Sequence, residues 1–340
     1  MNKINKQSLK SFIGGTISKS IIVLIVMLIV AAFATPYFYN IYNIQALLRD
    51  LAFIGMVSVA QSLVLLTGDI DLSVGSIASL CGVLSALIMT KYNINPYFAL
   101  ALGICFGIIC GALNGLIITK LRLNSMVATI GMSGFYSGIT LVLTKGKAIS
   151  NIPEEIQFLG KSNFLNIPTP FLIATIVTIV CVVIAKKSKF GRYVYAIGNS
   201  RESSKIIGID VDSIRMYLYI VVGVISSLSG ILYVARLGSA QSNIGGAWAT
   251  NSIASSVLGG ISLTGGIGNP IGSLLGASII SLIQNLIVLL GVNVYWQSAV
   301  SGIVVVLALS FSSISEIIKD KRELNSYVRK EINKDKEINL

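Results

Sequence analysis

The stretch LTGDIDLSVGSIAS at residues 66–79 places two carboxylates, Asp69 and Asp71, between long runs of apolar residues. A charge in such a setting is costly unless it is paired, hydrogen-bonded or used to cap a helix. The turn-forming pair Thr67-Gly68 precedes the first aspartate and indicates that one helix has ended there. We therefore expect a junction between two apolar helices, with Asp69, Asp71 and Ser73 at the junction.

The spacing of the two aspartates limits what they do together. On a continuous helix, side chains two positions apart point about 200° away from each other, so they do not line one pocket. Asp71 stands where an N-cap belongs, and a carboxylate there accepts backbone N–H groups and suits the helix dipole. The alternative is a coupling-ion or proton site, because acids inside membranes are commonly functional. We favour the capping role for Asp71.

The composition of the whole chain sets the fold class. Of its 340 residues, 54% are hydrophobic and 12% are charged, and the mean hydropathy is +0.81. Soluble domains carry about a quarter charged residues. Many apolar blocks approach the roughly 20 residues that a membrane-spanning helix needs. We predict an all-α polytopic membrane protein with about ten spans, at 18–36, 44–66, 72–90, 96–119, 126–144, 169–186, 214–235, 251–264, 271–291 and 295–313.

The basic residues predict the orientation of these spans. With the N-terminus inside, 20 of the 26 Lys and Arg residues fall in inside segments and six fall outside. Cytoplasmic loops carry an excess of Lys and Arg in membrane proteins. We therefore place both termini in the cytoplasm and assign the net charge of +12 to membrane orientation, not to nucleic acid. The charged segment at 316–340 is interpreted as a solvated cytoplasmic tail, with a partner-docking helix as the alternative.

Several chemistries are excluded by the residues that the chain lacks. It contains no histidine, which removes His-based acid–base catalysis, Ser-His triads and imidazole metal ligands. Its four cysteines stand in apolar segments without CxxC spacing, so we interpret them as small buried apolar residues. We expect no catalytic residues, no metal site and no cofactor bound by this chain.

Glycine is concentrated in two places. In the predicted span at 96–119, Gly103, Gly107, Gly111 and Gly115 recur every four residues, which keeps them near one helix face and lets a neighbouring helix approach closely. The stretch LGGISLTGGIGNPIGSLLG at 258–276 lacks the Lys-Ser/Thr of a phosphate-binding loop. It favours a broken or re-entrant helix, a feature that lines substrate paths in transporters. Simple turn geometry is the alternative.

The most informative polar segment lies at 186–216, between the sixth and seventh predicted spans. Asn199 is a candidate N-cap, and Glu202 follows three positions later, as in a capping box. Ile206, Ile207 and Ile209 supply apolar contacts, and Gly208 is suited to ending the helix. A short amphipathic helix with exposed isoleucines favours docking on a partner. The alternative is a loop helix that lies against the protein's own bundle.

Three motifs in preserved order resemble one family. TGDIDLSVGS, GRYVYAIGNSRESSKIIGIDV and VLGGISLTGGIGNPIGSLLGA are similar to the permease subunits of ribose-type sugar ABC importers, over roughly residues 45–312. The resemblance implies a transmembrane permease domain at 1–315, with a cytoplasmic coupling loop at 187–213. The coupling motif of such permeases, Glu-small-small-xxx-Gly, corresponds to Glu202, Ser203 and Ser204 followed by Gly208.

The same resemblance implies the partners of the chain. They are a cytoplasmic ATPase subunit that holds ATP and Mg, a second permease subunit in a homodimer or heterodimer, and an extracytoplasmic solute-binding protein. The chain contains no Walker A sequence, so ATP hydrolysis is expected in the separate ATPase chain. We expect the loop at 145–168 to form part of the outer mouth that receives sugar.

Two departures from the family pattern concern the cargo. Asp69 stands at the second glycine of the usual GGIDLS, and Ala249 and Asn251 stand where ribose permeases often carry two acidic residues. The cargo therefore stays open among ribose, galactose, xylose and autoinducer-2, and permeases for branched-chain amino acids or nucleosides are close alternatives.

A neutral sugar requires hydrogen-bonding groups along its path. The candidate polar side chains within the apolar spans are Gln61, Asn114, Asn251, Gln284 and Asn285. Each either lines the path or forms an interhelical hydrogen bond. Two alternatives of other classes are a stand-alone ion-coupled secondary transporter, which requires functional acids in the membrane, and a membrane-embedded glycosyl- or acyltransferase, which the absence of histidine and of paired acids disfavours.

Overall fold

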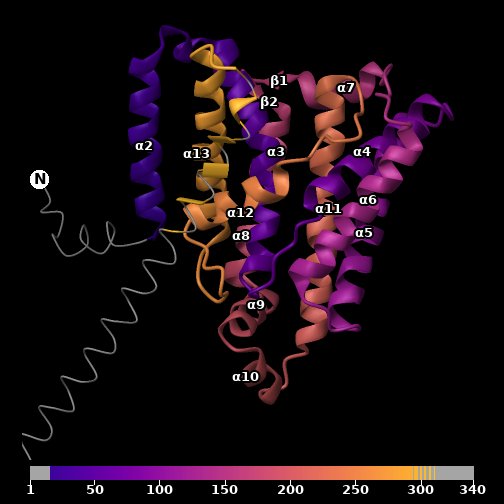
Figure 1. Cartoon of the computed structure of the whole chain (residues 1–340), viewed down its shortest axis with the longest axis vertical. Helices are drawn as coiled ribbons and strands as arrows, with labels where there is room; N and C mark the ends of the chain where they lie inside the picture. Colours follow the sequence, from indigo (N-terminus) through magenta and orange to yellow (C-terminus); the bar gives the residue numbers. More distant parts are fainter. Residues whose placement is uncertain are drawn as a thin grey trace, which may run out of the picture.

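A computed structural model describes residues 16–293, 295–297, 299–300, 302–303, 306–307 and 310. This part of the chain is a bundle of helices with one short antiparallel hairpin (Figure 1). The elements in chain order are α2 (Thr16–Ala34), the 3-10 helix η1 (Pro36–Tyr39), α3 (Ile41–Leu65), α4 (Val74–Thr90), α5 (Pro96–Thr119), α6 (Ser125–Thr144), α7 (Glu154–Lys161), β1 (Asn163–Phe164), β2 (Ile167–Pro168), α8 (Thr169–Lys187), α9 (Lys189–Asn199), α10 (Arg201–Ile206), α11 (Val211–Leu237), α12 (Trp248–Leu258) and α13 (Pro270–Leu289).

Seven helices among the described residues are long and apolar enough to cross a membrane, namely α2, α3, α5, α6, α8, α11 and α13. The prediction of a polytopic helical membrane protein is confirmed. The count of ten spans is not. The predicted span at 251–264 is the 11-residue helix α12 followed by a glycine-rich loop, and α4 has 17 residues. The predicted span at 295–313 and the tail at 316–340 lie largely or wholly outside the described residues.

Asparagines begin four of the long helices. The side chains of Asn40, Asn95, Asn124 and Asn269 accept backbone N–H groups at the starts of α3, α5, α6 and α13. Proline follows Asn95 and Asn269 directly, at a position where its missing N–H costs nothing. An asparagine oxygen is among the best acceptors for the orphan N–H groups of a first turn. Local sequence therefore fixes where these helices start.

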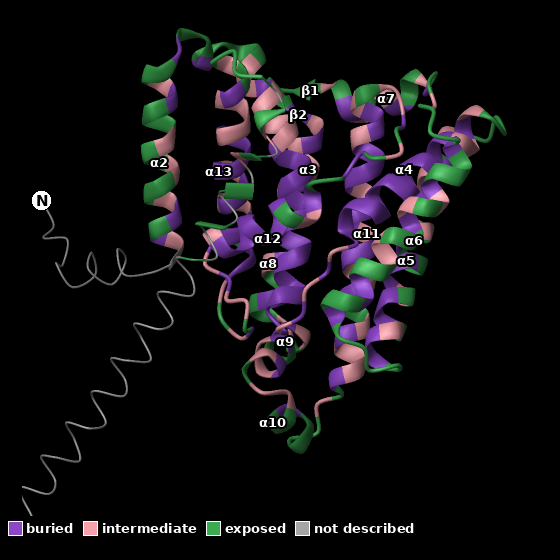
Figure 2. Ribbon diagram, in the orientation of Figure 1, coloured by how far each residue is buried: buried purple, intermediate pink, exposed green. Residues whose placement is uncertain are grey.

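Two helices form the centre of the bundle. Most residues of α3 and α11 are buried, whereas α2 and α6 expose most of their apolar side chains (Figure 2). An apolar face that no other helix covers is expected to contact lipid in a membrane protein. Of the seven candidate spans, α3 and α11 are thus the most buried, the shorter α4 and α12 are also mostly buried, and α2 and α6 lie at the margins.

The glycine repeat of α5 allows this helix to pack closely on α11. A Cβ added at Gly107 would lie 2.6 Å from the carbonyl oxygen of Gly223, and one at Gly111 would lie 2.3 Å from that of Tyr219. A Cβ at Gly115 would meet the Met216 backbone at 3.1 Å. The predicted close helix–helix approach is confirmed, with α11 as the partner.

Two interruptions divide the helical bundle. The first is the segment 66–73 between α3 and α4, and the second is the segment 259–269 between α12 and α13. At the second, Gly260, Gly265, Gly266 and Gly268 all have positive φ, which residues with a side chain rarely adopt. The expected break at 258–276 is therefore present, and it separates a short helix from a long one.

The segments outside the spans gather at opposite ends. Helices α9 and α10 project at one end, while α7 and the β1–β2 hairpin lie at the other (Figure 1). The hairpin pairs Phe164 with Ile167. The end with α9 and α10 is the one predicted to face the cytoplasm, and the loop 145–168 lies at the end predicted to face outward.

Candidate functional site: a central pocket and a coupling segment

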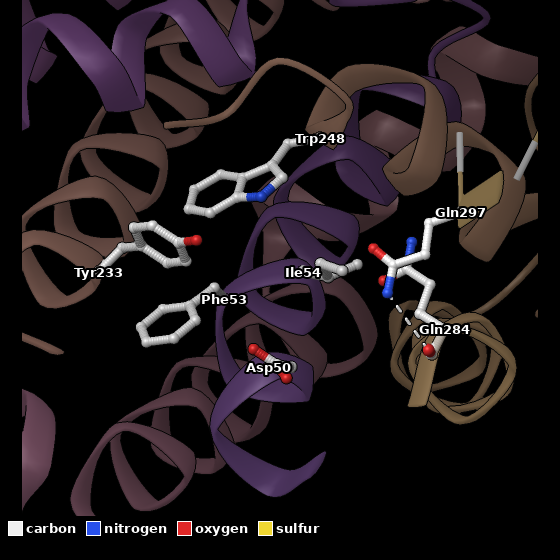
Figure 3. Close-up of a pocket in the computed structure, with 7 residues that line it drawn as sticks. All are labelled: Asp50, Phe53, Ile54, Tyr233, Trp248, Gln284 and Gln297. Atoms are coloured by element: carbon white, nitrogen blue, oxygen red, sulfur yellow. Dashed lines mark hydrogen bonds between the residues drawn. The ribbon is translucent and has the colours of Figure 1, made fainter. Parts of the chain in front are cut away.

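A pocket opens between α3, α11, α12 and α13 in the half of the molecule nearer the hairpin. Its volume is about 200 Å³. Figure 3 shows that its lining side chains come from all four helices and from the segment after α13. The lining residues are Asp50, Phe53, Ile54, Tyr233, Trp248, Gln284 and Gln297. A cavity with several aromatic walls and a few polar groups is typical of small-molecule sites.

Three aromatic side chains form one wall. The rings of Phe53 and Trp248 are parallel within 3°, with centroids 6.4 Å apart. Tyr233 meets both rings edge-on, at 5.1 Å from Phe53 and 5.6 Å from Trp248. Such edge and stacked contacts fix the ring orientations. The wall is therefore rigid, and its residues Phe53 and Trp248 are only 1% and 7% exposed.

Charges at the rim are paired with each other. Arg236 forms an ion pair with Asp50, and its guanidinium lies 5.7 Å from the centre of the Phe53 ring. The Asp50 side chain is about half exposed. Opposite the aromatic wall, the Gln297 amide donates to the Gln284 carbonyl at 3.4 Å. Among the described residues, the pocket thus offers hydrogen-bonding groups, and its charged lining residue Asp50 is paired, as suits a neutral polar solute.

Of the five predicted path residues, the structure places one in this pocket. Gln284 lines it, whereas its neighbour Asn285 is bonded to Asn43 of α3 at 2.8 Å. Asn251 is buried in α12, and its side-chain oxygen has no hydrogen-bond partner among the described residues. The assignment of these residues to a substrate path stays a prediction, with Gln284 best placed for it.

The other two predicted path residues hold the α3–α4 break together. Gln61, fully buried, faces the backbone of Asp71, and one orientation of its amide forms two 3.1 Å bonds to that residue. Asn114 of α5 donates to the Ser73 hydroxyl at 2.7 Å and accepts from Tyr136 of α6 at 3.0 Å. Both amides therefore act as interhelical hydrogen-bonding groups in this structure.

Asp71 does not cap α4 as predicted. The residue in the N-cap position is Ser73, and its side chain makes no capping bond. The Asp71 carboxylate instead accepts the Ser73 backbone N–H at 2.8 Å and the Ser73 hydroxyl at 2.6 Å, so it orders the turn one step before the helix. The reason is geometric, since Asp71 is three positions ahead of the first helical residue.

Asp69 lies at the centre of a buried ion cluster. Its carboxylate accepts from Arg215 Nε at 2.6 Å and Nη2 at 2.9 Å, and from Arg201 Nη2 at 2.8 Å. Arg201 Nη2 also donates to the Thr67 carbonyl at 3.1 Å. The cluster joins the end of α3 to α10 and to the start of α11. The two guanidinium groups therefore compensate the charge of the aspartate.

Within the predicted coupling loop at 187–213, the start of α10 differs from the prediction. Helix α10 is capped by Ser200, whose hydroxyl oxygen accepts the Ser203 N–H at 3.1 Å, and Asn199 is the last residue of α9. The prediction of Asn199 as the N-cap is wrong by one position because α9 continues through it. Glu202 lies in the first turn of α10.

The surface of α10 combines one anchored residue with two exposed apolar ones. Ser204 is buried, and its hydroxyl donates to the Ser200 carbonyl at 2.8 Å. Ile206 and Ile207 are 84% and 72% exposed. Gly208 follows with φ of +84°, a left-handed conformation suited to ending a helix. The two isoleucines therefore project from the bundle.

The loop after α10 is held by a local cap. Asp210 accepts the Ser213 hydroxyl at 2.6 Å and the Ser213 N–H at 3.1 Å at the start of α11. These hydrogen bonds hold the pKa of the Asp210 carboxyl below its usual value. The chain thus returns to the bundle immediately after α10.

Helix α9 packs against both interruptions of the bundle, the segments 66–73 and 259–269. A Cβ at Gly198 would lie 1.9 Å from the carbonyl oxygen of Leu66, so only glycine fits there. The Tyr195 hydroxyl donates to the Gly268 carbonyl at 2.9 Å, and the Gly266 N–H donates to Leu66 at 2.9 Å. Helix α9, the α3–α4 break and the α12–α13 break are therefore in direct contact.

Neither the aromatic wall nor the ion cluster around Asp69 was predicted from the sequence. Trp248 is one of only two tryptophans in the chain, and that rarity was the available signal for the pocket. Arg215 stands at the start of a long apolar span, where a charge generally requires a partner. Asp69 was the natural candidate, but its partner lies 146 positions away in sequence.

Comparison with known proteins identifies the family. The family described as "Branched-chain amino acid transport system / permease component" matches residues 43–309. The chain is 35% identical over 295 residues to the ribose import permease protein RbsC of Escherichia coli K12, covering 86% of this chain and 92% of that protein. It is 36% identical over 288 residues to RbsC of Bacillus subtilis 168, covering 84% and 89%.

A third relative carries a different name. The chain is 31% identical over 278 residues to the autoinducer 2 import system permease protein LsrC of Photorhabdus luminescens, covering 81% of this chain and 82% of that protein. No solved structure matches the chain. The family match covers most of the sequence, and these relatives align with 81–86% of it. The chain therefore belongs to this family of multi-pass permease components of the cell membrane.

Proposed function

We propose that the chain is the permease subunit of an ATP-binding-cassette importer that carries a monosaccharide across the cell membrane. It works with a cytoplasmic ATPase that binds ATP and Mg, with a second permease subunit, and with an extracytoplasmic binding protein that delivers the sugar. The names of relatives that align with 81–86% of the chain support this assignment. The chain itself supplies the path and the mechanical link, not the hydrolysis.

The observation that carries the proposal is the placement of α9 and α10. Exposed Ile206 and Ile207 offer an apolar contact for a partner, and the helix before them is packed against both interruptions of the bundle. A displacement of α10 is therefore transmitted through close backbone contacts to α3, α4, α12 and α13. Three of these helices, α3, α12 and α13, line the central pocket.

The chemistry of the pocket favours a neutral polyhydroxylated cargo. Aromatic faces from Phe53, Tyr233 and Trp248 suit the C–H surfaces of a sugar ring, and the polar groups opposite suit its hydroxyls. Asp50 and Arg236 are bonded to each other, which removes the free charges that an amino-acid zwitterion requires. We assign ribose or a sugar of similar size as the first substrate to test.

The ATPase partnership is tested by co-purification. The double variant Ile206→Ser/Ile207→Ser, expressed with the ATPase and solubilised in mild detergent, is expected to lose the ATPase while still inserting in the membrane. Phe164→Ser is the matched control, because Phe164 is 65% exposed at the opposite end of the molecule. Retention of the ATPase by the double variant, or its equal loss from the control, contradicts the docking role.

The cargo is tested by uptake. Proteoliposomes that hold the permease and the ATPase, with the binding protein outside, are expected to accumulate labelled ribose only when ATP and Mg are enclosed. Unlabelled xylose, galactose, autoinducer-2 and leucine are then added as competitors. If leucine competes and none of the sugars does, the assigned cargo becomes a branched-chain amino acid instead of a sugar. Uptake without ATP that follows an imposed ion gradient would instead favour a secondary transporter.

A further inference from the structure

The ion cluster around Asp69 joins parts of the chain between which the proposed mechanism transmits movement. Asp69 belongs to the break after α3, Arg201 is the first residue of α10, and Arg215 lies in the first turns of α11. The Asp69 side chain is 3% exposed, so its charge depends on these two partners. Leaving a buried charge unpaired is strongly unfavourable.

The two arginines hold the carboxylate in different ways. Arg215 donates two hydrogen bonds, one to each carboxylate oxygen, and its side chain is 10% exposed. Arg201 donates one bond to the carboxylate, and its side chain is 41% exposed. Bidentate, desolvated pairs are stronger than exposed single contacts. Arg215 is therefore the fixed partner of Asp69, and Arg201 is the partner that separates at lower cost.

Space is available beside the contact that separates more easily. A cavity of about 530 Å³ lies next to the cluster, and Asp69, Arg201 and Arg215 all face it. Lys205 of α10 and Asp212 of α11 also line it. Arg201 can therefore leave Asp69 without entering apolar surroundings, because the Asp212 carboxylate and other polar side chains line the same cavity.

The backbone contacts make the position of α10 consequential. The residue before α10, Ser200, follows the segment whose Gly198 touches the Leu66 carbonyl, and Arg201 also binds the Thr67 carbonyl. A displacement of α10 thus acts on the last turn of α3 by two routes. The first route is the steric contact of Gly198 with Leu66, and the second is the ion pair of Arg201 with Asp69.

We propose that Asp69 is a positioning residue for transport, which holds α10 against the end of α3 through Arg201 in this state. Displacement of α10 by the ATPase breaks the contact between Asp69 and Arg201, while Arg215 keeps the carboxylate neutralised. The closing and opening of this one ion pair links ATP-driven movement to the break that borders the path. This inference rests on the proposed function.

The test compares transport with ATP hydrolysis in the same reconstituted complex. Arg201→Gln is expected to keep ATP hydrolysis within about twofold of the unmodified complex and to lower the solute carried per ATP severalfold. Arg201→Lys restores a charge that makes one bond and is expected to recover most of that ratio. Arg122→Gln is the matched control, because Arg122 lines the same cavity and forms no ion pair among the described residues.

The outcomes separate this inference from the proposed function. If the unmodified complex neither binds an ATPase nor transports, the proposed function fails. If it transports and Arg201→Gln leaves the ratio of solute to ATP unchanged, the inference is overturned and the function stands. An equal loss in Arg122→Gln also overturns it, because the effect would then come from the charge of the cavity. A loss confined to Arg201→Gln, with recovery in Arg201→Lys, supports it.

Discussion

The rings of Phe53 and Trp248, from helices almost 200 residues apart in sequence, lie parallel within 3° at 6.4 Å between centroids. Tyr233 packs edge-on against both of them. The cluster therefore joins α3, α11 and α12 at the pocket. Its geometry comes from ring packing among three helices.

The first prediction concerns this aromatic wall. Trp248→Ala is expected to raise the half-saturating sugar concentration for uptake about tenfold, since an aromatic contact contributes roughly 0.5–1.5 kcal/mol beyond its buried area. The measurement is the concentration dependence of uptake in proteoliposomes. The other tryptophan provides the control, because Trp296 is 59% exposed and does not line the pocket. An unchanged half-saturating concentration in Trp248→Ala would remove the wall from the sugar site.

The second prediction concerns the stability of the ion cluster. Arg215→Gln is expected to lower the free energy of unfolding by about 3–5 kcal/mol, because it removes the bidentate partner of a buried carboxylate. Arg201→Gln is expected to cost about 0–1 kcal/mol, since that arginine is 41% exposed and its pairing is screened by water. Thermal unfolding of the purified complex in detergent measures both.

A double-mutant cycle isolates the pair itself. Asp69→Asn combined with Arg215→Gln is expected to be less destabilising than the two single changes added together, because neither charge is then left alone. Strict additivity would show that Asp69 and Arg215 act independently. That result would contradict the fixed pairing.

The third prediction concerns the glycine contact between α5 and α11. Gly111→Ala places a methyl group 2.3 Å from the Tyr219 carbonyl oxygen, so the helices must separate and the protein is expected to lose about 1–3 kcal/mol of stability. Gly131→Ala in α6 is the control, because a Cβ there meets nothing within 4 Å. The control is expected to be neutral or to stabilise by up to about 1 kcal/mol, as alanine favours helix. Equal thermal stability of the two variants would contradict the packing argument.

Patterns within short stretches predicted much of this architecture. The four-residue glycine repeat at 103–115 indicated a close helix partner, and the turn residues at 67–68 indicated a break after α3. Both features depend on neighbouring residues, since repeat spacing and turn preference are local properties of the chain. The predicted span at 251–264 was counted as a membrane span because an apolar composition does not distinguish a spanning helix from a short buried one such as α12.

The contacts that link distant segments were not predictable from the same patterns. The salt bridge between Asp69 and Arg201 spans 132 positions, and no local rule selects Arg201 over the other basic residues of its loop. Gln61 and Asn114 were equally ambiguous, because a buried amide serves a substrate or another helix with the same groups. Which role it takes depends on the neighbours that the fold supplies, here the Asp71 backbone and Ser73.

The fourth prediction concerns the start of α10, where sequence and structure differ by one residue. Ser200→Ala removes the oxygen that accepts the Ser203 N–H, which typically costs about 1 kcal/mol of helix stability. Amide hydrogen exchange across residues 201–206 is expected to become about fivefold faster, because local opening of the helix is that much easier. Asn199→Ala leaves the Ser200 cap in place and is expected to leave exchange in α10 nearly unchanged. If Asn199→Ala accelerates exchange and Ser200→Ala does not, the residue that caps α10 is Asn199.

Solute carried per ATP, measured on the same two variants, then reports whether an ordered α10 is needed to transmit movement. We expect the amount of solute carried per ATP to fall for Ser200→Ala alone. A partly unfolded α10 would deform when the ATPase displaces it and would transmit less movement to α3.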